Sequence, residues 1–247
     1  MSHLLALLAL LEGHCHALRA AHVSKPAARS AALGRRAALQ AGASLVPLLS
    51  RPPAATASLV RDGMAAFASG KIDESIELYD RVLRAQPEMR PYLWQRGLSL
   101  FYADRFVEGA AQFADDVSVN PNDTEEQLWH LLCLARVDGR GLAKARAARL
   151  QVGRDRRPVM RAVQALFLDG GASSLRALTE LAENGDASER FYAALYLGLY
   201  FEAEGAPPGE ARRWVRAAVA SRYAGAAGAA DPMVDLAKVH LKLRGWS

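Results

Sequence analysis

The chain has 247 residues, of which 51% are apolar and 23% are charged. This length and composition suit one or two globular domains, and they argue against a disordered tail or a protein with several membrane spans. Six of the 31 basic residues and one of the 26 acidic residues fall within residues 1–57, which leaves 25 of each in residues 58–247. The net charge of +5 therefore belongs to the N-terminal segment, and nucleic acid is not expected as a partner.

Residues 1–57 are arranged like a targeting presequence. Arg35 and Arg36 precede an uncharged stretch, residues 37–50, and the segment ends in Ala-Thr-Ala at 55–57, a small-x-small site for a signal peptidase. This layout resembles a twin-arginine export signal, and the uncharged stretch is too short to cross a bilayer core of about 30 Å. The 34 residues before the arginine pair resemble a chloroplast transit peptide. Together they predict the thylakoid lumen, with export to a bacterial periplasm as the alternative.

The next part of the chain repeats itself at an interval of 34 residues. Six pairs of similar residues share this spacing: Gly63 and Gly97, Phe67 and Phe101, Ile72 and Phe106, Tyr79 and Phe113, Leu83 and Val117, and Pro87 and Pro121. The pattern resembles the tetratricopeptide repeat (TPR), in which each unit is a pair of antiparallel helices. The resemblance implies that each glycine allows close approach of the second helix, that the aromatic residue fills the adjoining space, and that the proline ends the pair.

Charged residues stand at some positions of the repeat that are usually apolar or small. They include Asp62, Arg96 and Asp116. Two interpretations remain open for them. Either they form a buried ion pair between successive repeats, such as Asp62 with Arg96 or Arg96 with Asp116, or they face water.

Weaker helical patterns continue to the end of the chain. Helices are expected at 124–137, 141–150, 157–170, 174–185, 191–205, 209–221 and 231–246. Asp123 or Thr124 can cap the first of them, and Gly170-Gly171 marks a turn. No stretch alternates long enough to form a strand. Residues 58–247 are therefore predicted to be an all-α, TPR-like solenoid of four to five antiparallel helix pairs with a C-terminal capping helix.

The sequence offers little for catalysis. It contains no nucleophile elbow, phosphate-binding loop, dinucleotide motif or zinc motif, so no catalytic, cofactor-binding or metal-binding residues are expected. Cys133 and His130 are three residues apart on one expected helix and are the single nucleophile–base pair to weigh. The alternative, which we favour, is a buried structural cysteine beside a partly buried histidine.

Two surfaces are candidates for binding a protein partner. The first is an apolar groove on the first two repeats, lined by Val60, Met64, Phe67, Trp94, Leu98, Phe101 and Tyr102, which would suit an extended or helical peptide. The alternative is that these side chains pack against downstream helices that fold back.

The second surface is a basic patch with one acidic residue, Asp155. Its members are Lys144, Arg146, Arg149, Arg154, Arg156, Arg157 and Arg161. It would dock an acidic protein or contact an anionic membrane surface, or else it is a solvated helix face. RNA is disfavoured because no aromatic residue interrupts the patch.

These observations predict a non-enzymatic protein-interaction scaffold without cofactors. The presequence and the resemblance to TPR proteins imply an assembly or maintenance factor for photosynthetic membrane complexes in the thylakoid lumen. A periplasmic adaptor for envelope enzymes or proteases is the alternative, and an enzyme that depends on Cys133 and His130 is a third hypothesis.

Overall fold

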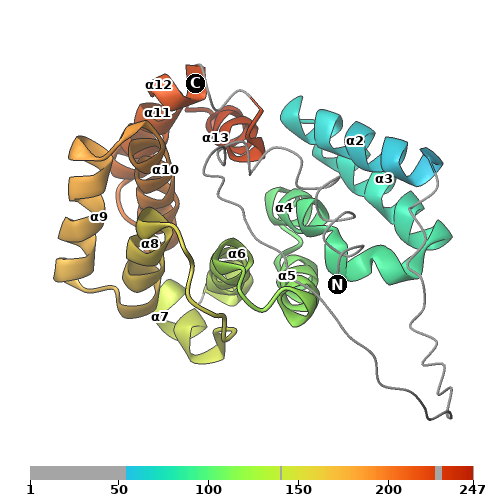
Figure 1. The fold of residues 1–247 in the computed structure, drawn as a ribbon, viewed down its shortest axis with the longest axis horizontal. Helices are drawn as coiled ribbons and strands as arrows, with labels where there is room; N and C mark the ends of the chain where they lie inside the picture. Colours follow the sequence, from blue (N-terminus) through green and yellow to red (C-terminus); the bar gives the residue numbers. More distant parts are fainter. Residues whose placement is uncertain (1–53, 140, 226–229, 247) are drawn as a thin grey trace, which may run out of the picture. The chain divides into compact units, whose positions relative to one another are not determined.

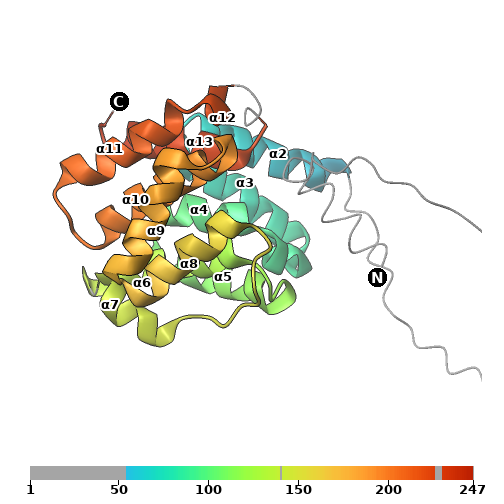
Figure 2. The same ribbon diagram turned by 60° about the vertical axis from the view of Figure 1, so that its left-hand side comes forward.

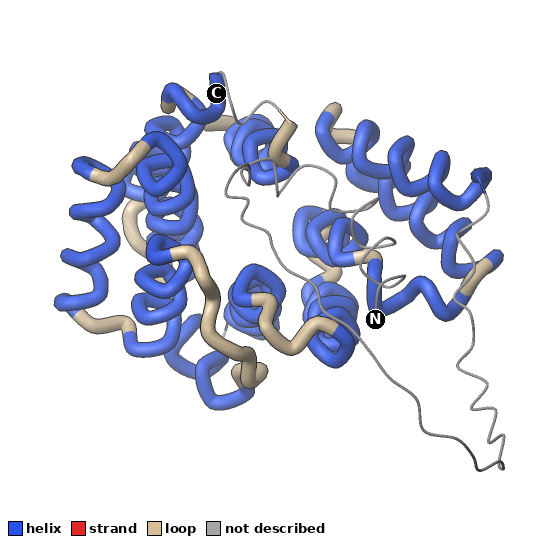
Figure 3. Tube along the Cα trace, viewed as in Figure 1, coloured by secondary structure: helices blue, strands red, loops and turns tan. Residues whose placement is uncertain are grey.

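The computed structural model describes residues 54–139, 141–225 and 230–246, which belong to one structural unit. The predicted presequence, apart from residues 54–57, lies outside the described residues. Residues 54–57 form the first turn of helix α2, so the proposed cleavage site is part of that helix. Figure 3 shows helices joined by loops, with no strand in the part of the chain that is described. The all-α prediction is confirmed.

The helices follow one another along the chain and pack in adjacent pairs (Figure 1). The pairs are α2 with α3, α4 with α5, α8 with α9, and α10 with α11, while α6 packs against both α5 and α7. The bounds are α2 (Ala54–Ala68), α3 (Ile72–Ala85), α4 (Trp94–Tyr102), α5 (Phe106–Val119), α6 (Thr124–Arg136), α7 (Gly141–Ala145), α8 (Pro158–Asp169), α9 (Ala172–Asn184), α10 (Ala187–Ala203), α11 (Pro208–Val219), α12 (Arg222–Gly225) and α13 (Pro232–Leu243). Short 3₁₀ turns occupy Pro87–Tyr92, Val137–Gly139 and Arg146–Ala148.

The first two helix pairs share one packing device at the 34-residue spacing. A Cβ atom on Gly63 would lie 2.8 Å from Cζ of Tyr79, and one on Gly97 would lie 2.6 Å from Cζ of Phe113. Both rings are fully buried. Each glycine is therefore required because the aromatic ring of the second helix rests directly on the backbone of the first.

Arg96 and Asp62, two of the charged residues in the repeat, have different surroundings in the structure. Arg96 is buried and its Nε donates to Oδ1 of Asp80 at 2.7 Å. Asp62 is exposed and accepts a hydrogen bond from Ser58 Oγ, so it faces water, and the ion pair of Arg96 is with Asp80 rather than with Asp62. Asp80 lies in α3, the second helix of the first repeat, so the ion pair joins the first repeat to the second.

The helix expected at 141–150 is much shorter in the structure. Helix α7 ends at Ala145 and is followed by a 3₁₀ turn and by non-helical backbone over 149–157. Leu142 and Ala145 are its buried residues, and the next four residues, Arg-Ala-Ala-Arg, contain no large apolar side chain to bury. Pro158 then holds Arg157 in an extended conformation, with φ −75° and ψ 123°, before α8 begins.

The remaining expected helices are present, and their ends agree with the capping residues. Asp123 caps α6, Gly170 ends α8 in the left-handed conformation with φ 63°, and Asp231 caps α13. Among the described residues no helix has both the length and the hydropathy needed to cross a membrane.

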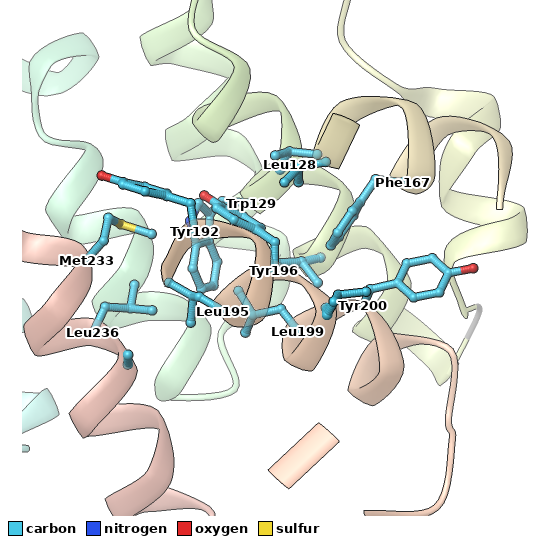
Figure 4. Close-up of a cluster of buried hydrophobic side chains, with 14 of the residues drawn as sticks. Leu128, Trp129, Phe167, Tyr192, Leu195, Tyr196, Leu199, Tyr200, Met233 and Leu236 are labelled. Carbon is cyan, nitrogen blue, oxygen red and sulfur yellow. The ribbon is translucent and has the colours of Figure 1, made fainter. Parts of the chain in front are cut away.

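Helix α10 is the centre of the C-terminal part. All residues from Phe191 to Tyr200 are buried. Figure 4 shows Tyr196 of α10 near Phe167 of α8, with Met233 and Leu236 of α13 in the same apolar cluster. A helix that is apolar on every side must be covered on every side, and α6, α8, α9, α11 and α12 all contact it.

Helix α13 does more than cap the last helix pair. It packs against α11 and also against α2, so the end of the described chain meets its beginning. Figures 1 and 2 show α13 beside α11 with α2 close by in both views.

Candidate protein-binding surfaces

The residues predicted to line the apolar groove lie mostly in the interior. Five of the seven are at most 9% exposed, and two stay partly exposed. The buried members are Val60, Phe67, Leu98, Phe101 and Tyr102, and the partly exposed members are Met64 and Trp94. The described structure therefore leaves two side chains, rather than seven, accessible to a peptide at this place.

Helix α13 and the residues that follow it contact Tyr102 and the end of α2. The hydroxyl of Tyr102 hydrogen-bonds Nδ1 of His240 at 2.9 Å, and the guanidinium of Arg244 lies 5.8 Å from the centre of the same ring. Nζ of Lys242 donates to the carbonyl oxygen of Ser69 at 2.8 Å, at the end of α2. The C-terminal helix thus covers Tyr102, one of the residues predicted to bind a peptide.

His240 has the properties of a buried structural residue. Its side chain is fully buried, and burial lowers its pKa to about 4. The ring is therefore neutral at physiological pH, which allows Nδ1 to share a hydrogen bond with Tyr102. This contact joins residues 138 positions apart, and no local sequence pattern predicts it.

The seven predicted members of the basic patch divide into two groups. Three are held by the fold: Arg146, Arg157 and Arg161. Four are exposed: Lys144, Arg149, Arg154 and Arg156. We call these four exposed residues the basic segment.

Arg157 and Arg146 join distant elements. The guanidinium of Arg157 lies between Oε2 of Glu125 and Oδ2 of Asp155, both at 2.9 Å, and 5.6 Å from the ring centre of Tyr192. Tyr196 donates to the other oxygen of Glu125 at 3.1 Å. Burial raises the pKa of Glu125, and the charge of Arg157 opposes that rise. Arg146 in turn donates to the carbonyl oxygen of Phe167 and pairs with Glu204.

A second carboxyl group is buried on α6 without such a partner. Glu126 is 6% exposed, and its Oε2 has no hydrogen bond within the described part of the chain. Burial raises its pKa well above the ordinary value, and the carboxyl groups of Asp123 and Asp116 raise it further. The uncharged form of Glu126 is therefore favoured in the folded protein.

Cys133 and His130 do not form an activated pair. The thiol is fully buried, burial raises its pKa, and its Sγ packs 2.9 Å from the Cβ position of Gly109. Burial lowers the pKa of His130 to about 4, and its Nδ1 accepts no hydrogen bond from a described residue. A nucleophilic cysteine needs an accessible thiolate with a neighbouring positive charge, and the surroundings of Cys133 oppose both.

The remaining tests concern metals and relatives. Within the described residues no group of three or more His, Cys, Asp or Glu side chains is placed to hold a metal ion. No protein-family model matches the chain, and no curated protein matches it significantly.

Proposed function

We propose that the protein is a non-enzymatic scaffold that docks an acidic protein partner through the basic segment, Lys144, Arg149, Arg154 and Arg156. The observation that carries this proposal is that four cationic side chains are exposed close together in the chain, Lys144 on helix α7 and the other three on non-helical backbone that the fold holds in place. Positive charge on a preorganised surface favours encounter with an acidic partner and lowers the entropy cost of binding it.

The backbone of this region is anchored at several points. The carbonyl oxygen of Leu150 accepts from Nε2 of Gln127, and the amide of Gly153 donates to the carbonyl oxygen of Pro121 at 2.8 Å. Arg161 donates to the carbonyl oxygens of Asp155 and Arg156, at 3.1 and 2.8 Å. These hydrogen bonds hold the non-helical backbone in place, so the exposed arginines project from a fixed main chain.

The more specific proposal is an assembly or maintenance factor for photosynthetic membrane complexes in the thylakoid lumen. Its support is the TPR-like repeat at residues 58–121 and the arrangement of residues 1–57. The matching close contacts of Gly63 and Gly97 with rings 16 residues further on support a repeat unit of the TPR kind. Fractionation with sequencing of the mature N-terminus tests the location, since a chain that starts at Met1 contradicts both plastid and periplasmic export.

The docking proposal is tested by charge reversal. The full chain carrying Lys144→Glu, Arg149→Glu, Arg154→Glu and Arg156→Glu is used for affinity capture beside the wild type. A matched control reverses four exposed arginines elsewhere: Arg61, Arg81, Arg176 and Arg212. Wild type and control are expected to retain the same membrane-complex subunits in mass spectrometry, while the segment variant loses them. Equal recovery by the segment variant contradicts docking at this place, and the absence of membrane-complex subunits contradicts the specific role.

The enzyme hypothesis has its own test. Cys133→Ser removes the thiol but puts a hydroxyl into the buried core, so thermal unfolding first shows that the variant is folded. A phenotype unchanged by this substitution is expected for a scaffold, whereas loss of function in a folded variant would support a catalytic thiol.

A further inference from the structure

A pocket of about 300 Å³ lies where the end of α9 and the start of α10 meet the junction of α11 and α12. Its lining combines the methyl groups of five alanines with one hydroxyl and two guanidinium groups, and it includes no carboxylate. The residues are Ala182, Ala187, Arg190, Ala194, Ala217, Ala220, Ser221 and Arg222. None of them belongs to the basic segment or to the predicted groove.

The two positive charges of this pocket lack a protein counter-charge. Arg190 and Arg222 are exposed, and neither guanidinium has a hydrogen bond or ion pair to another residue of the described chain. The acidic residues closest to Arg190 in the sequence, Asp186 and Glu189, form the capping box at the start of α10 and make no ion pair with it. Asp186 accepts from the amide of Glu189 at 2.8 Å, and Glu189 accepts from the amide of Asp186 at 3.0 Å. An anion in this pocket would therefore be attracted by both guanidinium groups.

Ser221 adds a neutral donor to the two cations. Its Oγ accepts from the amide of Ala224 at 3.2 Å, which leaves the hydroxyl proton available for donation. A guanidinium presents several donors in a planar fork that matches phosphate oxygens. Two such forks and a hydroxyl balance the double negative charge of a phosphate monoester more closely than the single charge of a carboxylate.

The size and the apolar walls indicate more than a bare phosphate ion. The volume of about 300 Å³ is at the lower end of small-molecule sites, which run from about 300 to 1,000 Å³. The alanine methyl groups offer apolar contact for an organic substituent. We propose that this pocket binds a small organic phosphate monoester, with the phosphate held by Arg190, Arg222 and Ser221 and the organic part against the alanines.

The test uses calorimetric titration of the full chain with phenyl phosphate, inorganic phosphate and benzoate. Phenyl phosphate is expected to bind, and inorganic phosphate is expected to bind at least about tenfold more weakly because it lacks contact with the alanines. Arg190→Gln and Arg222→Gln are each expected to weaken phenyl phosphate binding by about tenfold or more. Arg176→Gln, an exposed arginine of α9 outside the pocket, is the matched control and is expected to bind as the wild type does.

A filling variant gives a second, independent readout. Ala217 lines the pocket and is exposed on α11, so Ala217→Leu narrows the pocket without placing a larger side chain in the core. This variant is expected to weaken phenyl phosphate binding. Thermal unfolding of each variant confirms that it is folded. The proposal is overturned if phenyl phosphate does not bind the wild type, if Arg176→Gln weakens binding as much as the pocket variants, or if Ala217→Leu leaves binding unchanged. Inorganic phosphate binding as tightly as phenyl phosphate, or benzoate binding more tightly, overturns the assigned ligand class.

Discussion

The first and last helix pairs use glycine in the same way but place different groups against it. In the N-terminal region, α2–α5, the three atoms nearest to the Cβ positions of Gly63 and Gly97 are all aromatic ring atoms. In the C-terminal region, α10–α13, the Cβ position of Gly198 meets a methyl group of Val215, the carbonyl oxygen of Ala211 at 3.0 Å and the amide nitrogen of Val215 at 3.1 Å. The helices α10 and α11 therefore approach backbone to backbone.

This difference explains why the repeat is visible in one region and faint in the other. An aromatic ring that fills the space beside a glycine leaves a paired signature in the sequence, as with Gly97 and Phe113. When the second helix moves closer there is no room for the ring, and Val215 with Ala211 suffices. Helix pairs thus pack closely in two ways, with glycine against an aromatic ring or with glycine against small side chains. An alignment at constant spacing detects the first kind and not the second.

The largest expected loss of stability distinguishes a glycine packed against main-chain atoms from one packed against an aromatic ring. Gly198→Ala is expected to destabilise the fold by about 3 kcal/mol, because the new methyl group meets main-chain atoms that cannot move alone. Gly97→Ala is expected to cost about 1–2 kcal/mol, because the Phe113 ring can give way in part. Urea unfolding followed by circular dichroism measures both. Gly209→Ala is the control, since a Cβ there meets no atom within 4 Å and no loss is expected.

Double variants sharpen the same contrast. Phe113→Leu shortens the group that opposes residue 97 and is expected to recover part of the loss from Gly97→Ala. Val215→Ala is expected to recover less of the loss from Gly198→Ala, because the contact with the Ala211 carbonyl remains. Equal recovery in both regions would show that the two packings do not differ in the way described.

The packing of neighbouring helices could be predicted from the sequence, whereas the contacts between elements far apart in the chain could not. Periodicity and capping residues located Asp123, Gly170 and Asp231 because a helix end depends on a few adjacent residues. The burial of Tyr102 depends on His240, which lies 138 positions further on. Periodicity placed Tyr102 on an inner helix face, but it could not show that the same chain supplies the helix that covers it.

Charged surfaces could be predicted only where the charged residues lie close together in the sequence. A count of basic residues found the patch at 144–161, but it could not tell Arg157, which is held by Glu125, from the exposed Arg156 beside it. Arg190 and Arg222 were not selected, because they are 32 positions apart and belong to no local cluster of charge. The pocket exists only where the helices bring them together.

Arg157 tests the contact between α6 and the segment before α8. Arg157→Met is expected to cost about 2 kcal/mol, because it leaves the carboxylates of Glu125 and Asp155 without their partner. The value is below that of a fully buried pair since the arginine side chain is 40% exposed and solvent screens it. Arg156→Met, one residue away and exposed, is expected to be neutral. A similar loss from both variants would point to the backbone of 149–157 rather than to the ion pairs.

Glu126 lies on α6, the helix between the two regions, and its buried carboxyl group is expected to make the stability of the protein depend on pH. Because its pKa is raised in the folded state, the native protein binds this proton more tightly than the unfolded chain does. Stability from this residue is therefore lost as pH rises above the ordinary glutamate pKa of about 4.5. Glu126→Gln keeps the size but cannot ionise, so the unfolded chain no longer gains by losing a proton, and the protein is expected to be about 1 kcal/mol more stable at pH 7.

The measurement is the unfolding free energy of both proteins between pH 5 and pH 8. The advantage of Glu126→Gln over the wild type is expected to grow as pH rises through this range. Glu88→Gln, at an exposed position, is the control and is expected to change neither the stability nor its slope. An advantage that stays constant with pH would show that the carboxyl group is not held in its uncharged form.

The smallest expected effect concerns the contact that brings the two regions together. Tyr102→Phe removes the hydroxyl that bonds to His240, and a buried hydrogen bond of this kind contributes about 1 kcal/mol. Tyr92→Phe is the matched control, because Tyr92 is partly exposed and its ring remains in place. Hydrogen exchange provides the informative readout. If α13 is held against α4 by this bond, Tyr102→Phe raises exchange in α13 as well as in α4, whereas a change limited to α4 would mean that α13 is held by α11 and α2 alone.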